Sequence, residues 1–164
     1  MEANRLSQVV RQKAREFEDL CEKVDENTAS RAPEGRWSPK QIVSHLLGPE
    51  GAGLGSAVRT ILEQDNPTLD VKTEDPFFSE KRANTPFAEL MREFEREYDD
   101  LADLVNKLSQ DQLNRKVRIP AFKETPLGEY PTLGVFIQGI VEYHLTFHLD
   151  HMQEILQALG DRAA

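Results

Sequence analysis

The segment Tyr143-His144-Leu145-Thr146-Phe147-His148-Leu149-Asp150-His151 carries three of the four histidines of this 164-residue chain. In an α-helix, where each residue turns by about 100°, positions 144, 148 and 151 fall within an arc of roughly 60°. The same face continues with aliphatic side chains, namely Ile137, Ile140, Val141 and Ile155. The pattern predicts a helix that begins after Pro131-Thr132, ends at Gly160 and turns its histidines toward the core of a bundle.

The fourth histidine, His45, lies in Trp37-Ser38-Pro39-Lys40-Gln41-Ile42-Val43-Ser44-His45-Leu46. Ser38 is a good N-cap and Pro39 suits the first helical position, so a helix is predicted to begin here with His45 on its inner face. Imidazole is the commonest protein ligand of transition metals, and three histidines with an open fourth position form catalytic zinc sites. His45 and a histidine pair from the last helix therefore predict a metal site.

The spacing in the last helix leaves two pairs open. His144 and His151 are separated by about 10 Å of helix rise, so binding of one ion by both, with His148 between them, would be crowded. The i, i+4 pair 144/148 and the i, i+3 pair 148/151 both fit a shared ion. A polar network of core histidines is the alternative to a metal site, and each buried ring nitrogen would then need a hydrogen-bond partner.

Further amphipathic stretches complete the predicted fold. Apolar residues recur at spacings of three and four along residues 6–24, 54–62 and 87–108. The stretch 48–53 interrupts the second helix, for which we expect a kink or two abutting segments. The sequence predicts an all-α fold, a four-helix bundle of mostly up-down-up-down order, in a single domain over residues 1–164.

The connections between these helices are predicted to be irregular, at residues 25–36, about 67–85 and 109–131. In the second connection, Pro76-Phe77-Phe78 is expected to tuck onto the core. In the third, Val117-Arg118-Ile119 is expected to form a short extended piece.

The composition argues against several classes of function. A formal net charge of −9 disfavours binding to nucleic acid or to an anionic membrane surface, both of which attract clustered Lys and Arg. No apolar run approaches the 18 residues or so of a membrane span. Cys21 is the only cysteine, and Met1-Glu2-Ala3-Asn4-Arg5 lacks the apolar stretch of a signal peptide, so we expect a cytoplasmic protein without disulfides.

Three other side chains are candidates for the site or its surroundings. Glu50 follows His45 by five residues, close to the same helical face, and is the candidate catalytic base or hydrogen-bond partner of a ligand. Cys21 lies on an apolar helical stripe and is predicted to be a packed residue rather than a nucleophile. Trp37 is predicted to anchor the start of the second helix in the core.

Both histidine segments resemble motifs of one family. Residues 37–46 are similar to W-S-x-x-E-[IL]-[LV]-x-H-[LI], and residues 144–152 are similar to H-x-x-x-H-x-x-Q-[IL], of the DinB-like (YfiT-like) metal-dependent bundle proteins. The order of elements is similar over nearly the whole chain. The resemblance implies a four-helix bundle in which His45, His144 and His148 hold one divalent ion.

The chain departs from these motifs at two places. His151 stands at the usual glutamine position, so it either supports a ligand or replaces one. Gly48-Pro49, just after the first motif, is expected to reshape the mouth of the pocket.

Zinc or nickel is the expected ion and iron or manganese the alternative, because imidazole binds several of these metals.

The resemblance also implies a function. The family includes S-transferases that use bacterial low-molecular-weight thiols and a maleylpyruvate isomerase. The hypothesis is a metal-dependent enzyme, concretely a thiol S-transferase acting on electrophilic small molecules, although isomerisation or hydrolysis can use the same ion. The alternative is a non-catalytic bundle that binds metal or a small molecule. The expected partners are a small-molecule substrate, a low-molecular-weight thiol and a second copy of the chain in a homodimer.

Overall fold

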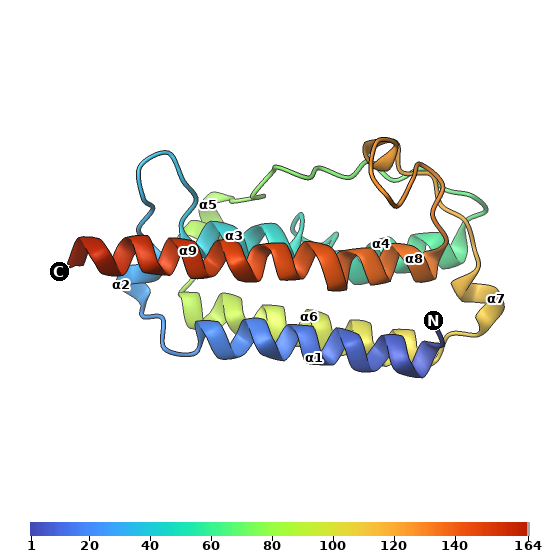
Figure 1. Ribbon diagram of the computed structural model, residues 1–164, viewed down its shortest axis with the longest axis horizontal. Helices are drawn as coiled ribbons and strands as arrows, with labels where there is room; N and C mark the ends of the chain where they lie inside the picture. The colour runs from blue at the N-terminus through green and yellow to red at the C-terminus, as the bar shows by residue number, and fades with distance from the viewer. Residues whose placement is uncertain (164) are drawn as a thin grey trace.

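The protein is built from helices that lie side by side along one axis (Figure 1). The computed structural model describes the backbone of residues 1–163 and the side chains of residues 1–160. The α-helices are α1 (Ala3–Cys21), α2 (Glu26–Ala29), α3 (Pro39–Leu47), α4 (Leu54–Glu63), α5 (Glu80–Ala83), α6 (Phe87–Asn106), α7 (Gln110–Leu113), α8 (Leu133–Gln138) and α9 (Leu145–Ala163). The 3-10 helix η1 spans Pro120–Phe122, and the π-helix η2 spans Gly139–His144.

Four long units form the bundle: α1, α3 with α4, α6, and the continuous run of α8, η2 and α9 (Figure 1). The α1 helix packs against α6 and α9, and α3 also packs against both of these helices, so α1 and α3 lie diagonally across the bundle. One hydrophobic core joins the units, and its largest fully buried side chains include Phe17, Phe94 and Tyr98. The all-α four-helix bundle predicted from the sequence is thus observed.

The direction of the helices differs from the predicted up-down-up-down order. Ser7 on α1 bonds to the carbonyl of Ala102 on α6, while Arg11 pairs with Asp99, so these two helices are antiparallel. The α6 helix instead runs parallel to α3 and α4, from α5 beside α3 toward the far end of α4 (Figure 1). The connection over residues 64–86 makes this order achievable, because an extended chain of that length easily spans a 20-residue helix.

The second unit begins and bends as the sequence predicts. Ser38 accepts a hydrogen bond from the backbone of Gln41, whose side chain accepts from the backbone of Ser38, so a complete capping box starts α3. Gly48 ends this helix with a φ of +75°, a conformation that costs glycine little. Two abutting helices, α3 and α4, therefore replace one long helix.

The last unit departs from the predicted regular helix in two places. Residues 139–144 form a wide π-turn. The helix was predicted to end at Gly160 but continues to Ala163. Glycine alone did not stop this helix because it lowers helix stability by only about 1 kcal/mol. Leu145 and Met152 are buried beside His148, whereas His144 and His151 are half-buried.

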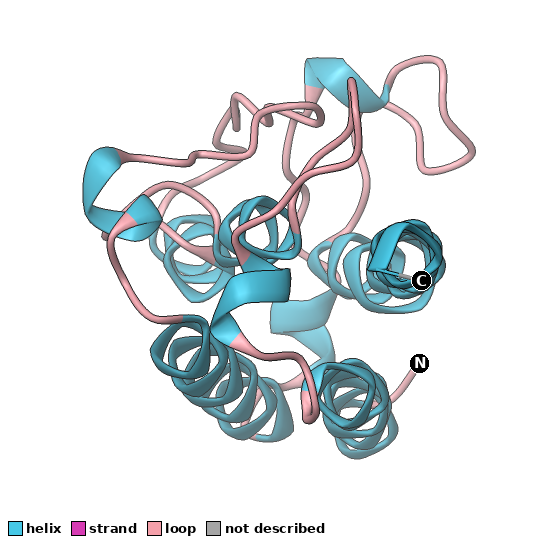
Figure 2. Cartoon of the chain, turned by 90° about the vertical axis from the view of Figure 1, so that its left-hand side faces the viewer, coloured by secondary structure: helices cyan, strands magenta, loops and turns pink. Residues whose placement is uncertain are grey.

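The loops contain more order than predicted. The short helices α2 and α7 directly follow Asp25 and Ser109, and each of these two residues caps its helix by accepting a backbone hydrogen bond. Arg118 forms an isolated parallel bridge with Thr68, as an extended piece at 117–119 would allow, and residues 1–163 contain no longer strand pairing. No helix among them has the length and apolarity needed to cross a membrane. The loops gather over one side of the bundle (Figure 2).

Candidate metal centre

Three histidines converge where α3 faces the last helical unit. The Nε2 atom of His144 lies 2.9 Å from Nε2 of His45 and 3.1 Å from Nε2 of His148. One ligand atom from each of the three lies within 4.8 Å of the other two. Two nitrogens bound at about 2.1 Å to one ion are about 3.0–3.4 Å apart for bond angles of 90–109°. The two Nε2 distances to His144 therefore suit a shared metal ion.

The outer ring nitrogen of His45 is fixed by the backbone. Its Nδ1 lies 2.7 Å from the carbonyl oxygen of Asp75. Because a carbonyl can only accept, this Nδ1 carries the proton, and Nε2 of a neutral His45 presents a lone pair to the centre. Orientation of a ligating histidine through its second nitrogen is the usual arrangement at metal sites.

The converging nitrogens cannot all satisfy one another as hydrogen bonds. His144 Nε2 can donate one proton to His45, but its lone pair is then no longer available to His148. A cation at this point would instead accept three lone pairs at once. The donor set therefore fits a divalent metal ion better than it fits the polar core network considered from the sequence.

His151 contacts the outer ring nitrogen of His148. Its Nδ1 lies 3.3 Å from Nδ1 of His148, on the side of that ring opposite the converging Nε2 atoms. This placement agrees with a supporting role and leaves the 144/148 pair as the one that faces His45.

Burial keeps these imidazoles neutral. Desolvation lowers the pKa of His144 to about 4, helped by the charge of His45. Desolvation and the charges of the neighbouring histidines lower the pKa of His148 to about 2. For His45, burial lowers the pKa although the Asp75 carbonyl acts in the opposite direction. Neutral imidazole is the form that binds metal, so these three side chains are in the metal-binding form at neutral pH.

Aromatic rings enclose the triad. Trp37, expected only as a core anchor, stacks parallel to His148 at a centroid distance of 6.4 Å and lies 5.3 Å from the ring of His45. Phe77 stacks on His45 at 6.1 Å, and Phe147 meets His148 edge-on at 5.0 Å. The 76–78 segment thus packs on His45 through Phe77, and Phe77 and Phe78 do not join the hydrophobic core, contrary to the prediction.

Arg82 holds the loop that orients His45. Its guanidinium, 7% exposed, donates to the carbonyls of Ser44, Gly48 and Phe77. Burial lowers the pKa of Arg82, while the charges of Glu50 and Glu93 raise it. Neither Arg82 nor the Asp75 carbonyl could be found from the sequence, because neither belongs to a motif and both reach the site through a long loop.

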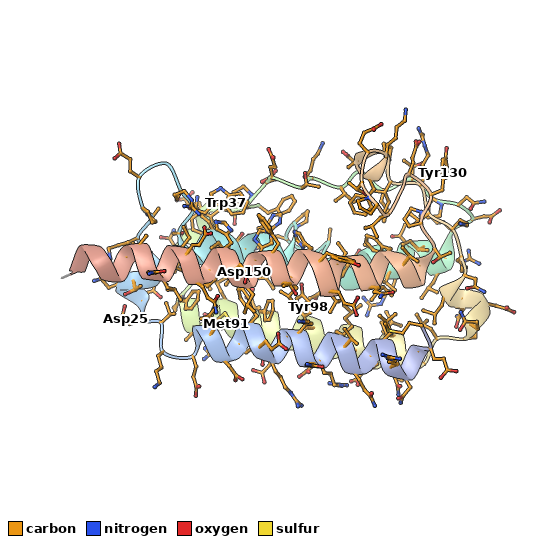
Figure 3. The ribbon with its side chains drawn as sticks, in the orientation of Figure 1. Asp25, Trp37, Met91, Tyr98, Tyr130 and Asp150 are labelled. Atoms are coloured by element: carbon orange, nitrogen blue, oxygen red, sulfur yellow. The ribbon has the colours of Figure 1, made fainter. Side chains whose placement is uncertain are left out.

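The remaining candidates, Glu50 and Cys21, lie apart from the three histidines. Glu50 is exposed and accepts a hydrogen bond from Ser79, so its catalytic role stays a prediction. Cys21 is buried, and desolvation raises its pKa to about 12, as expected for a packed residue. Asp150 lies exposed on the outer side of α9 (Figure 3).

A cavity of about 710 Å³ opens beside the triad. His45 and His144 form part of its wall, together with Phe77, Phe147 and Pro49. His148 lies behind them and under Trp37, outside this wall. An ion held by the three histidines would therefore have protein on one side and the cavity on the other.

The fold and the site together define a class of protein, the four-helix bundles in which histidines from two helices converge. The chain matches the family model of the DinB superfamily over residues 10–159, and it belongs to this superfamily. Its fold is similar to that of YfiT from Bacillus subtilis, described as a probable metal-dependent hydrolase with an unusual four-helix bundle topology. The two share 17% sequence identity with a TM-score of 0.75, over 96% of this chain and 87% of YfiT. A search of curated proteins found no match.

Proposed function

We propose that this protein is a metal-dependent enzyme, of the thiol S-transferase type, acting on electrophilic small molecules. The observation that carries the proposal is the convergence of three neutral imidazoles beside an open cavity. A divalent ion held there supplies a Lewis acid that lowers the pKa of a bound thiol or water. Resemblance to a family with thiol-dependent transferases supports the choice of a thiol.

The residues of the chain would prepare the site in three ways. His45 is held in one tautomer by the Asp75 carbonyl, so its Nε2 lone pair is fixed in direction. Trp37 and Phe77 exclude water from the rings of the ligands. Leu46 and Pro49 make the cavity wall beside the triad apolar, which strengthens electrostatic interactions inside it.

The transfer itself would form one bond and break another. The thiol loses its proton through solvent to Glu50, its sulfur bonds to an electrophilic carbon, and the leaving group departs with the electron pair of the broken bond. A thiol needs little help in this step, because its pKa of about 8.5 lies far below that of water. Glu50 remains the predicted proton acceptor, reached through solvent at the cavity mouth.

Cobalt substitution tests the proposal directly. We expect the visible spectrum of the cobalt-loaded protein to change when a low-molecular-weight thiol is added, and we expect thiol transfer to an electrophilic aryl halide to stop after chelation. His148→Ala should lose both signals, whereas the matched variant His151→Gln should keep them. If no thiol or small anion changes the spectrum, the ion has no open position and only the non-catalytic alternative remains. Ester hydrolysis without thiol transfer would favour a water nucleophile instead.

A further inference from the structure

The cavity extends well beyond the histidines. From His144 its wall continues along the last helical unit to Phe136, eight residues earlier, which corresponds to roughly 10–12 Å. Thr60 on α4 and Phe122 in η1 line the same distant region. The space is therefore much longer than a site for a thiol or a water molecule needs to be.

The walls of this extension are mainly apolar. Ala57 on α4 and Ile140 in η2 line its sides, and Leu69 and Leu127 close it from two loops that pass over α4 and α8 (Figure 1). Leu127 approaches so closely that a Cβ atom on Gly139 would lie 2.7 Å from its side chain. Such a lining binds an apolar body, because burial of each methylene group favours binding about fourfold.

One buried polar group breaks this apolar lining. Tyr98 is 2% exposed, lines the cavity and lies between α6 and the last helical unit (Figure 3). Its ring packs on Phe94 at a centroid distance of 4.4 Å. Its hydroxyl is not among the fully enclosed, unpartnered polar atoms of residues 1–160, so it is accessible from the cavity that Tyr98 lines. Burial and the charge of Glu97 raise the pKa of Tyr98, so the hydroxyl remains a proton donor at neutral pH. Buried tyrosine hydroxyls usually have a partner, and here a ligand can supply it.

We propose that the substrate is an elongated organic molecule with a metal-binding head at the histidines, an apolar body along α4 and α8, and one polar atom that accepts a hydrogen bond from Tyr98. The head-group part of this inference rests on the proposed function, whereas the apolar body and Tyr98 follow from the cavity itself.

A series of n-alkyl hydroxamates on the zinc-loaded protein tests the apolar body. Titration calorimetry from acetohydroxamate upward should give an affinity that rises about fourfold per methylene until the alkyl group reaches Phe136. Ala57→Phe, which places a ring in the middle of the space, should abolish this rise while acetohydroxamate still binds. Ala88→Phe is the matched control, because Ala88 is exposed on α6 and lies outside the cavity wall.

The outcomes separate this inference from the proposed function. Equal affinity for all alkyl lengths in the wild type, with acetohydroxamate bound, overturns the elongated substrate and leaves the metal site intact. An unchanged rise in folded Ala57→Phe overturns it as well. If no hydroxamate binds the zinc-loaded protein, the open coordination position is absent and the proposed function falls with the inference.

A positional scan tests Tyr98. Each methylene of a long hydroxamate is replaced in turn by an ether oxygen. The compound whose oxygen lies beside Tyr98 should bind the wild-type protein about three- to tenfold tighter than the other ethers do. Tyr98→Phe should remove this preference and leave the alkyl series unchanged. If wild type and Tyr98→Phe respond identically at every position, Tyr98 does not recognise the substrate.

Discussion

Replacing Arg82 with methionine should damage both the stability of the fold and the proposed metal site. The guanidinium donates to the side chain and carbonyl of Ser44 at 3.1 Å and to the carbonyl of Phe77 at 3.2 Å, and also to Gly48. Methionine fills similar space but donates nothing. All of these contacts come from Nη1, which carries two protons, and the Phe77 carbonyl also accepts from Ser44 Oγ at 3.0 Å. With about two hydrogen bonds lost at about 1 kcal/mol each, the free energy of unfolding should fall by about 2 kcal/mol.

The effect on metal binding follows from the Phe77 contact. Without it, the Asp75–Phe77 segment keeps its bond from Ser44 Oγ but loses the one from Arg82, so the carbonyl that fixes His45 Nδ1 is held less firmly. Loss of such support typically weakens metal binding 10–100-fold. Urea unfolding of the metal-free protein measures the first effect, and competition for zinc with a chromogenic chelator measures the second.

Arg96→Met provides the control, because Arg96 is an exposed arginine on α6, the helix that comes next in the chain after Arg82. It should change stability by less than about 0.5 kcal/mol and leave zinc affinity unchanged. If Arg82→Met loses stability but keeps zinc affinity within threefold of the wild type, the loop does not position His45. If neither quantity changes, the reasoning about the guanidinium is wrong.

Three further predictions concern the histidines and assembly. His148→Ala should abolish stoichiometric metal binding measured by elemental analysis, whereas His151→Gln should retain it; loss of metal from His151→Gln with His144→Ala still loaded would favour the 148/151 pair. The metal-free protein should lose stability as pH falls from about 6.5 to about 4, because the unfolded chain protonates His144 before the folded one does, with a slope of up to about 1.4 kcal/mol per pH unit for each such histidine; a flat series of urea midpoints would contradict this. Sedimentation at tens of micromolar should give the mass of a dimer, and a mass near one chain would refute the homodimer.

Local signals in the sequence predicted the parts of the fold that depend on neighbouring residues. Ser38, Pro39 and Gln41 set the start of α3 through contacts within four residues, so the capping pattern was readable. The histidine spacing likewise predicted a site between two helices, because periodicity reports which face is buried. The structure brings His45 together with His144 and His148, while metal binding by these residues stays a prediction.

Other features depend on contacts that sequence patterns do not encode. The parallel course of α6 is decided by where residues 64–86 pass over the bundle, and Arg82 acts on segments 34 to 38 residues earlier in the chain. The π-turn at 139–144 also escaped prediction, since its sequence carries no pattern that distinguishes a π-turn from an α-helix and the close packing of Leu127 on Gly139 comes from a distant loop.

The wide turn of η2 has a consequence for insertions and deletions. A π-turn places one extra residue in a helix, and such insertions are frequent at functional sites. If residues 139–144 formed a regular α-helix at the same chain length, the eight residues from Phe136 to His144 would turn by about 800°, and Phe136 would lie about 80° away from the line that it shares with His144. Deletion of one residue together with the π-turn would leave seven residues and about 700°, which returns Phe136 to within about 20° of that line. The alignment of a reactive centre with the body of its substrate would thus depend on one extra residue and the wide turn that absorbs it.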